Sequence, residues 1–266
     1  MLIMKKFCLL AAFMSTVIHA HEPYMTPLSH FTDNSQVAVL AGYAEEALNS
    51  EHALKNFEII VTDPQQHSSK IKSSTDLKSV SVIDLTLPNS GTYLLETKAS
   101  FPLNYVKDQK VWKMLFEVPS NKAGPKSDRD YLIPDDFKNK RYSIEKITRE
   151  WTLQSYITKK QVSSLAVDGT APIQVNFQAN PTTLKINEPV HVNIFKNKQP
   201  LKNADIHVRY KGESDKDARH IKSDQDGNAT LIFNHSGEYL LEVTEQIDPT
   251  QKPKDQFYTI ISLSIK

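Results

Sequence analysis

A seven-residue pattern occurs twice in this chain of 266 residues. Ser-Gly-x-Tyr-Leu-Leu-Glu fills residues 90–96 and returns at residues 236–242. Such a repeat indicates two copies of one supersecondary unit. In each copy the glycine permits a tight corner, and the tyrosine hydroxyl can bond back to the backbone of that corner, as in the tyrosine corner of immunoglobulin-like sandwiches. The alternative, a common hairpin turn, explains two matching copies less well.

Alternation of apolar and polar residues predicts β-strands through most of the chain. In the second half it predicts seven strands, the number that a small immunoglobulin-like sandwich requires. These strands are expected at residues 173–177, 189–195, 204–210, 218–222, 228–233, 238–243 and 257–265.

The first half is less regular. Its strands are expected at residues 35–41, 57–62, 80–87, 92–98 and 151–158, with a hairpin that joins residues 105–106 to residues 111–116. Helical periodicity is scarce, and only residues 44–55 and 135–139 are candidate helices.

The predicted fold is therefore all-β, with two tandem immunoglobulin-like β-sandwich domains. We expect the first domain at residues 21–168 and the second at residues 169–266. Proline and glycine residues predict a long surface loop inserted in the first domain, at about residues 119–140.

The first twenty residues have the pattern of a secretory signal peptide. Lys5 and Lys6 precede an apolar run at residues 7–18, and small Ala20 precedes a polar flank. The run is too short for a membrane anchor, so we expect cleavage after Ala20 and a periplasmic or secreted protein. Cleavage would also remove Cys8, the only cysteine, so no disulfide or thiolate would remain.

Composition excludes other classes of partner. Thirty-two basic and 31 acidic side chains give a net charge of +1, which offers no basic surplus for nucleic acid. After the signal peptide no segment reaches 18 apolar residues, so no membrane span is expected in the mature chain.

Several stretches together resemble an exported bacterial family called domain of unknown function 4198. They include Tyr-Ala-Glu-Glu-Ala at residues 43–47, Trp-Thr-Leu-Gln-Ser-Tyr-Ile-Thr at residues 151–158, and the second copy of the repeat. The resemblance implies a periplasmic protein of immunoglobulin-like domains, with a signal peptide cleaved just before a histidine, here His21. Some relatives are labelled as accessory proteins of nickel or cobalt uptake. Many relatives have Gly-His where this chain has Gly42-Tyr43.

His21 is the sharpest candidate for chemistry. After cleavage its α-amine and ring Nδ1 could chelate one metal ion, and one more imidazole would complete a site for Cu(II), or, with carboxylates, for Ni(II), Co(II) or Zn(II). Glu22 adds a neighbouring carboxylate, and second ligands are expected among His30, His52 and His67. The other interpretation stays open, in which His21 is the exposed start of a first strand.

Three functions remain. The first is a non-catalytic periplasmic binding protein that handles a divalent metal ion or assists a metal transporter. The second is a cell-envelope interaction protein without metal, docking another envelope protein. The third is a copper enzyme with a histidine brace. Because the motifs of common hydrolases, zinc proteases and nucleotide-binding enzymes are absent from the sequence, we expect no catalytic residues and favour the first function.

Overall fold

The computed structural model describes residues 22–138, 141–165 and 169–266. Within these ranges the regular structure is β-strand, apart from short 3-10 turns at Lys126–Asp128, Pro134–Phe137, Pro181–Thr183 and Asp215–Asp217. The strands of the first half are β1 (Glu22–Pro27), β2 (Phe31–Thr32), β3 (Gln36–Ala44), β4 (His52–Ala53), β5 (Glu58–Thr62), β6 (Ser68–Lys72), β7 (Thr75–Asp76), β8 (Ser81–Thr86), β9 (Gly91–Asp108), β10 (Val111–Met114) and β11 (Ile144–Lys159). Those of the second half are β12 (Ile173–Phe177), β13 (Val190–Lys196), β14 (Gln199–Pro200), β15 (Asp205–Tyr210), β16 (Arg219–Lys222), β17 (Asn228–Leu231), β18 (Gly237–Thr244) and β19 (Gln256–Ile265).

One sheet runs through both halves of the chain. This central sheet has ten strands, in the order β16-β15-β18-β19-β11-β9-β5-β6 with β10 and β2 attached. Its seam is the parallel pairing of β11 with β19, from Arg149 opposite Gln256 to Ser155 opposite Ser262. A first outer sheet contains β1, β3, β8, β7 and β4, and a second outer sheet contains β12, β13, β14 and β17.

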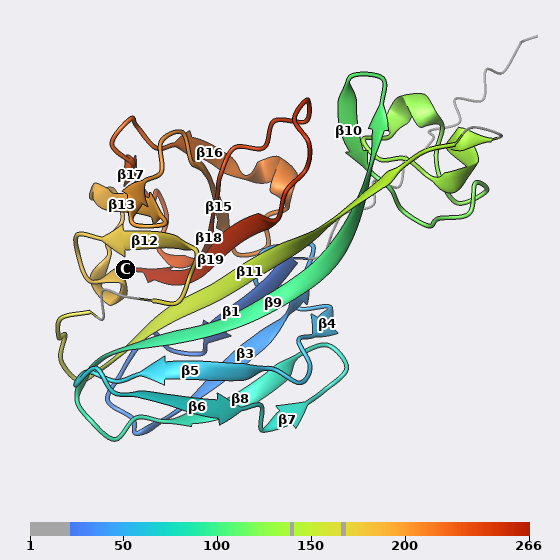
Figure 1. The fold of residues 1–266 in the computed structure, drawn as a ribbon. Helices are drawn as coiled ribbons and strands as arrows, with labels where there is room; N and C mark the ends of the chain where they lie inside the picture. The colour runs from blue at the N-terminus through green and yellow to red at the C-terminus, as the bar shows by residue number, and fades with distance from the viewer. Residues whose placement is uncertain (1–21, 139–140, 166–168) are drawn as a thin grey trace, which may run out of the picture.

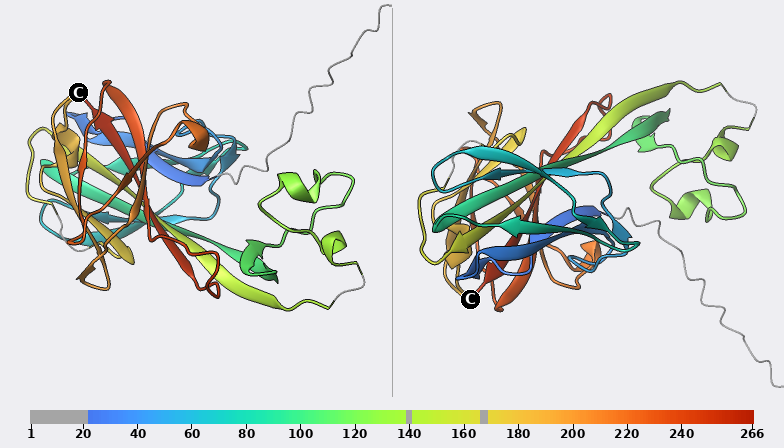
Figure 2. Two further views of the ribbon diagram at one scale, coloured as in Figure 1. Left: turned by 90° about the horizontal axis from the view of Figure 1, so that it is seen from above. Right: turned by 90° about the horizontal axis from the view of Figure 1, so that it is seen from below.

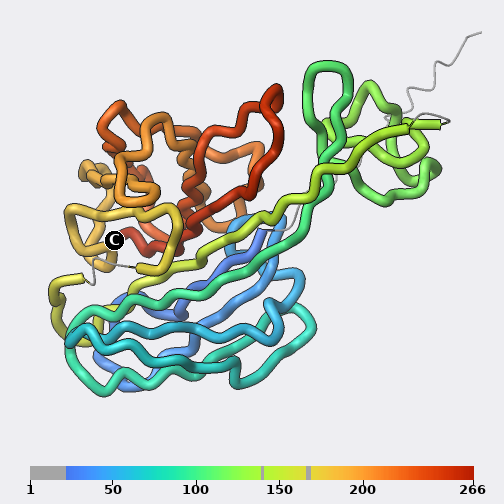
Figure 3. Tube along the Cα trace, viewed as in Figure 1, coloured from blue at the N-terminus to red at the C-terminus, as the bar shows by residue number. Residues whose placement is uncertain are grey.

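The central sheet is covered on both faces. Leu240 and Ile260 pack in one apolar core with the first outer sheet, whereas their neighbours Leu241 and Ile261 pack in the other core with the second outer sheet. In a half-exposed strand, buried and exposed residues alternate. A strand covered on both faces has no such alternation, and β11 is buried at every residue from Trp151 to Lys159. Figures 1 and 3 show the two halves on opposite sides of the long β9 and β11 strands.

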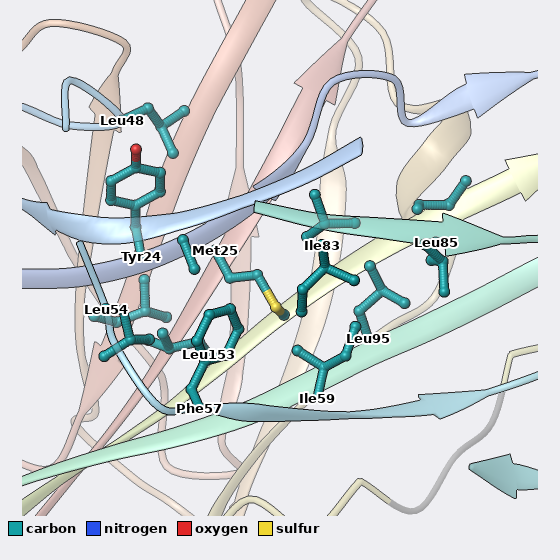
Figure 4. Packing of buried hydrophobic residues seen from close by; sticks show 14 of the residues in the cluster. Tyr24, Met25, Leu48, Leu54, Phe57, Ile59, Ile83, Leu85, Leu95 and Leu153 are labelled. Atoms are coloured by element: carbon teal, nitrogen blue, oxygen red, sulfur yellow. The ribbon is translucent and has the colours of Figure 1, made fainter. Parts of the chain in front are cut away.

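The first core is a tight packing of aliphatic side chains from both sheets. Met25 of β1 and Ile83 of β8 face Ile59, Leu95 and Leu153 of the central sheet (Figure 4). All five are at most 1% exposed. Burying a side chain of this size stabilises the fold by roughly 1.5–3 kcal/mol, so this layer holds β1 firmly in place.

The paired strands β9 and β11 extend beyond the two cores as an arm. β10 pairs with the end of β9, and the segment between β10 and β11 forms the tip of the arm (Figures 1 and 2). A small cluster of Val106, Leu115 and Leu132 and a buried ion pair between Arg129 and Asp136 hold this tip together. The predicted hairpin is therefore confirmed, although residues 92–98 and 105–106 belong to one strand rather than two.

Both tyrosine corners are confirmed. The Tyr93 hydroxyl donates to the Asn89 carbonyl at 2.8 Å and the Tyr239 hydroxyl to the His235 carbonyl at 3.0 Å. Gly91 and Gly237 have φ angles of 132° and 133°, a conformation that favours glycine. All seven strands expected in the second half are also present.

The helix expected at residues 44–55 is wrong. This segment consists of the last residue of β3, turns and the short β4, and Leu48 has a φ of 62°. Its apolar residues Ala47, Leu48 and Leu54 are buried in the first core near Tyr24, so tertiary burial overrides the local helical pattern. The second candidate helix is one 3-10 turn at Pro134–Phe137, and residue 139 lies outside the described residues. Among the described residues no helix has the length and apolar character needed to cross a membrane.

Candidate functional site

A row of ionisable side chains crosses the second half of the central sheet. His220 of β16 lies opposite His207 of β15, which lies opposite Glu242 of β18. Directly opposed residues share a face, so this row continues into Ile260 of the first core. This face of the central sheet therefore carries apolar side chains where the first outer sheet covers it, and ionisable side chains at this row on β15, β16 and β18.

A pocket of about 310 Å³ lies over this row. We call it the junction pocket, because β1 of the first half contributes Glu22 to a lining that comes mainly from the second half. Its acids and histidines include Glu22, Asp205, Asp215, Glu242, His207 and His220, and its lining also contains Arg149, Trp151 and Tyr258.

Arg209 ties β1 to the second half. Its side chain is 2% exposed, and its guanidinium donates hydrogen bonds to the carboxylates of Glu22 and Asp215. Burial opposes the charge, but the neighbouring carboxylates, Glu22 first, raise the pKa of Arg209 above its usual value. Arg209 therefore stays positively charged, and its ion pair with Glu22 holds that residue at the pocket.

Glu242 is a buried acid with one unsatisfied oxygen. It is 3% exposed, and among the described residues its Oε2 has no hydrogen-bond partner. The closest ion-pair contact of that oxygen is Nη2 of Arg209 at 3.8 Å, and Oε1 lies 3.7 Å from Nδ1 of His207. Burial and then the Glu22 carboxylate raise the pKa of Glu242 well above its usual value. An orphaned buried oxygen that lines a cavity points to a partner that the protein does not itself supply.

The two histidines beside Glu242 are in contact. Their rings lie 4.3 Å apart at 65°. Burial and then the neighbouring His220 lower the pKa of His207, which favours its neutral form. The neutral imidazole is the form that ligates metal ions, so His207 is in a suitable state to donate a nitrogen ligand.

The described residues do not form a complete metal site by themselves. No group of three histidines or acids among them is placed to hold an ion. An ion in the junction pocket would therefore need a donor from elsewhere. His21, which lies outside the described residues, immediately precedes Glu22 in the sequence.

The predicted ligands are not all brought together. Glu22 reaches the pocket, but His30 lies beyond the other end of β1, which spans about 17 Å at about 3.3 Å per residue. His30 is 6% exposed, with Nδ1 3.0 Å from the Tyr156 carbonyl and Nε2 3.5 Å from the Thr26 hydroxyl. Burial lowers the pKa of His30 to about 4.

His52 is exposed and stands two strands away from β1. It pairs with Tyr43, which pairs with Pro23. Because neighbours along a strand alternate between faces, Glu22 and His52 are on opposite faces of the first outer sheet. His67 is 82% exposed beside Asp63. The site proposed below therefore contains Glu22 but not these histidines.

His207 and His220 are not among the metal ligands expected from the sequence. Alternation puts His207 on the polar side of its strand, but its position opposite His220 is set by the hairpin of β15 and β16, and its position opposite Glu242 by the pairing of β15 with β18. The Asp215–Asp217 turn lies within that hairpin. If the register of this hairpin had been predicted, the two histidines would have been found as neighbours.

Comparison with known proteins places the chain in a family. The model described as "Domain of unknown function (DUF4198)" matches residues 18–246. The chain belongs to this family. No curated protein matches it.

The solved structures to which the chain is similar include three distant ones. The FN1–FN3 domains of chicken CNTN1 are 12% identical, with 92% of this chain and 65% of that chain covered and a TM-score of 0.25. A tetra-tandem repeat of a large adhesion protein is 10% identical, with 92% and 49% covered and a TM-score of 0.24. The NIE–MG1 domains of Escherichia coli alpha-2-macroglobulin are 11% identical, with 91% and 97% covered and a TM-score of 0.22. The chain spans less than two thirds of the first two, and scores of this size do not establish a common overall fold.

Proposed function

We propose that this protein is an exported, non-catalytic binding protein that holds a divalent metal ion in the junction pocket. In this proposal the signal peptide is removed after Ala20, and the mature protein is periplasmic or secreted. It contains two immunoglobulin-like units, residues 21–168 and 169–266, and its partner is a metal ion, with an envelope transporter as the protein that receives or supplies the ion.

The observation that carries the proposal is the position of Glu22. β1 and Arg209 hold this residue in a pocket that also contains His207, His220 and the unsatisfied Oε2 of Glu242. Cleavage after Ala20 would make His21, which immediately precedes Glu22, the first residue of the mature chain. It would then carry a free α-amine as well as its imidazole. These donors would supplement an incomplete set of imidazole and carboxylate ligands, a mixture that suits Ni(II), Co(II), Cu(II) or Zn(II).

Isothermal titration of correctly processed protein with each of these four ions tests the proposal. We expect one ion to bind per chain. Replacing both histidines of the pair (His207→Ala with His220→Ala) should weaken binding at least tenfold, the lower end of what even outer-shell partners of metal sites contribute.

Two controls separate the site from the other histidines. Replacing His191 and His235, which lie on a different sheet and at a corner outside the pocket lining, should leave the affinity within about twofold. A protein with one extra residue before His21 should lose affinity, because its α-amine is displaced. Equal heats for the processed and the extended protein would remove His21 from the site.

A further inference from the structure

The junction pocket is larger than a single metal ion requires. Its volume is about 310 Å³, whereas one water molecule accounts for about 30 Å³ of the liquid and small-molecule pockets begin near 300 Å³. A second cavity of about 320 Å³ adjoins it and shares Glu245 and Ile247 in its lining. A bare ion would leave most of this space to water, and an ion bound to an organic molecule would fill it.

The pocket also offers a guanidinium that forms no ion pair with an acid among the described residues. The Arg149 guanidinium lies 5.2 Å from the ring centroid of Tyr258 and 5.9 Å from that of Trp151. Its Nε donates to Oε1 of Gln256 at 2.8 Å. Within the part of the chain that the structure describes, its two terminal nitrogens make no hydrogen bond. Stacking and the bond to Gln256 fix the plane of this guanidinium, which is then ready to bind a carboxylate through two parallel bonds.

The junction pocket therefore combines opposite preferences. His207, His220 and Glu242 favour a cation, whereas Arg149 favours a carboxylate and the faces of Trp151 and Tyr258 favour carbon. A free ion uses only the first set of groups. An organic acid alone would meet the acids of the pocket with like charge. A metal ion carried by a carboxylate chelator satisfies both sets, and it brings the donor atoms that the described residues lack.

On the basis of the proposed function, we infer that the pocket takes its divalent ion as a complex with a small carboxylate chelator, whose carboxylate binds Arg149. Two sources share this chemistry, an α-amino acid and a hydroxycarboxylic acid. Arg149 is then a specificity residue for the chelate and not a ligand of the ion.

Calorimetry with Ni(II) alone, Ni(II) with L-histidine and Ni(II) with citrate tests this inference in wild type, Arg149→Gln and Arg149→Lys. Arg149→Gln should weaken binding of the preferred chelate at least about tenfold, since it removes a charge-assisted bidentate pair. Arg149→Lys should recover only part of that loss, because an ammonium cannot form both bonds. Neither variant should bind bare Ni(II) more weakly than wild type, because Arg149 is not a ligand of the ion and its charge repels a cation. Arg141→Gln, an exposed arginine on the distant arm, is the matched control.

Native mass spectrometry should show the protein with ion and chelator bound together. The chelator that gives this mass, L-histidine or citrate, identifies the source. The inference is wrong if both chelators merely withdraw Ni(II) from the wild-type protein, or if Arg149→Gln weakens bare and chelated Ni(II) equally while the protein stays folded. If none of Ni(II), Co(II), Cu(II) and Zn(II) binds in either form, the proposed function fails together with it.

Discussion

The last residue of each repeat copy is a buried glutamate, but the two glutamates differ in their hydrogen-bond partners. Glu96 is 2% exposed and Glu242 is 3% exposed. Oxygens of Glu96 accept hydrogen bonds from Nε2 of Gln154 at 2.8 Å and from the Thr170 amide at 2.9 Å, as well as from the Thr170 hydroxyl. Glu242 instead borders the junction pocket with an oxygen that lacks a hydrogen-bond partner among the described residues.

The difference separates a structural carboxylate from one that is available for binding. Glu96 also borders a cavity, of about 280 Å³, but Gln154 and Thr170 donate hydrogen bonds to its oxygens, and a Cβ on Gly169 would lie 2.8 Å from its Oε2. Glu242 is held near Arg209 and His207, and its Oε2 borders its cavity without a hydrogen-bond partner among the described residues. Equal burial of equivalent residues thus has two outcomes, which depend on whether the neighbouring residues supply hydrogen-bond donors to the carboxylate.

The largest expected effect tests how the open site is held. Arg209→Ala should destabilise the protein by about 3–5 kcal/mol, because it leaves the carboxylates of Glu22, Asp215 and Glu242 without their buried cation. Urea unfolding followed by tryptophan fluorescence measures this loss. A cost below about 1 kcal/mol would show that these acids are solvated in the folded protein and that the contrast with Glu96 is not one of burial.

The two glutamates can be compared directly. Glu96→Ala should cost about 3 kcal/mol, because the buried donors of Gln154 and Thr170 lose their acceptor. Glu242→Gln should change stability by less than about 1 kcal/mol, because the raised pKa of Glu242 favours a neutral carboxyl, which an amide of the same shape replaces. Urea unfolding of both variants in one buffer provides the comparison. Equal losses would mean that both carboxylates are structural.

His30, a buried histidine in the first half, contrasts with His207 and His220, which line the junction pocket. Burial lowers the pKa of His30 to about 4, whereas an unfolded histidine titrates near 6.5. The unfolded state therefore binds the proton first, and His30 stabilises the fold fully above about pH 6.5 and progressively less as pH falls towards 4. The loss is at most about 1.4 kcal/mol per pH unit, or about 3 kcal/mol in all.

Urea unfolding between pH 7 and pH 4 measures the contribution of His30. Wild type should lose stability more steeply than His30→Gln over this range. His191→Gln is the control, since His191 is exposed on β13. Parallel curves for wild type and His30→Gln would contradict the sealed environment of His30.

The smallest effect concerns the two tyrosine corners. Tyr239→Phe should cost about 1 kcal/mol, the net contribution of one hydrogen bond. Tyr93→Phe should cost more, because the Tyr93 hydroxyl both donates to the Asn89 carbonyl and accepts from the Asn89 amide, each at 2.8 Å. Thermal unfolding of the two variants checks this order. A larger loss at Tyr239 would show that the second hydrogen bond at Tyr93 does not contribute to stability.

Local patterns predicted much of the fold. The repeat predicted both tyrosine corners, because a corner is formed by residues four apart and needs no distant partner. Alternation predicted the strands of the second half, since their inner faces meet an apolar core. It failed at residues 44–55, where Ala47, Leu48 and Leu54 are buried near Tyr24 and no helix forms. Of the candidate site it identified Glu22 alone among the residues that the structure describes.

By itself, the sequence determined the strands, the two corners and the all-β class, because each depends on neighbours a few residues away. Only the tertiary structure decided which faces are buried. In an isolated sandwich the glutamate that follows Tyr-Leu-Leu would face solvent, as alternation implies. Here the two halves share one sheet through β11 and β19, so each half covers the outward glutamate of the other. Pairing across more than a hundred residues created the buried acids at Glu96 and Glu242, and no local pattern could have indicated them.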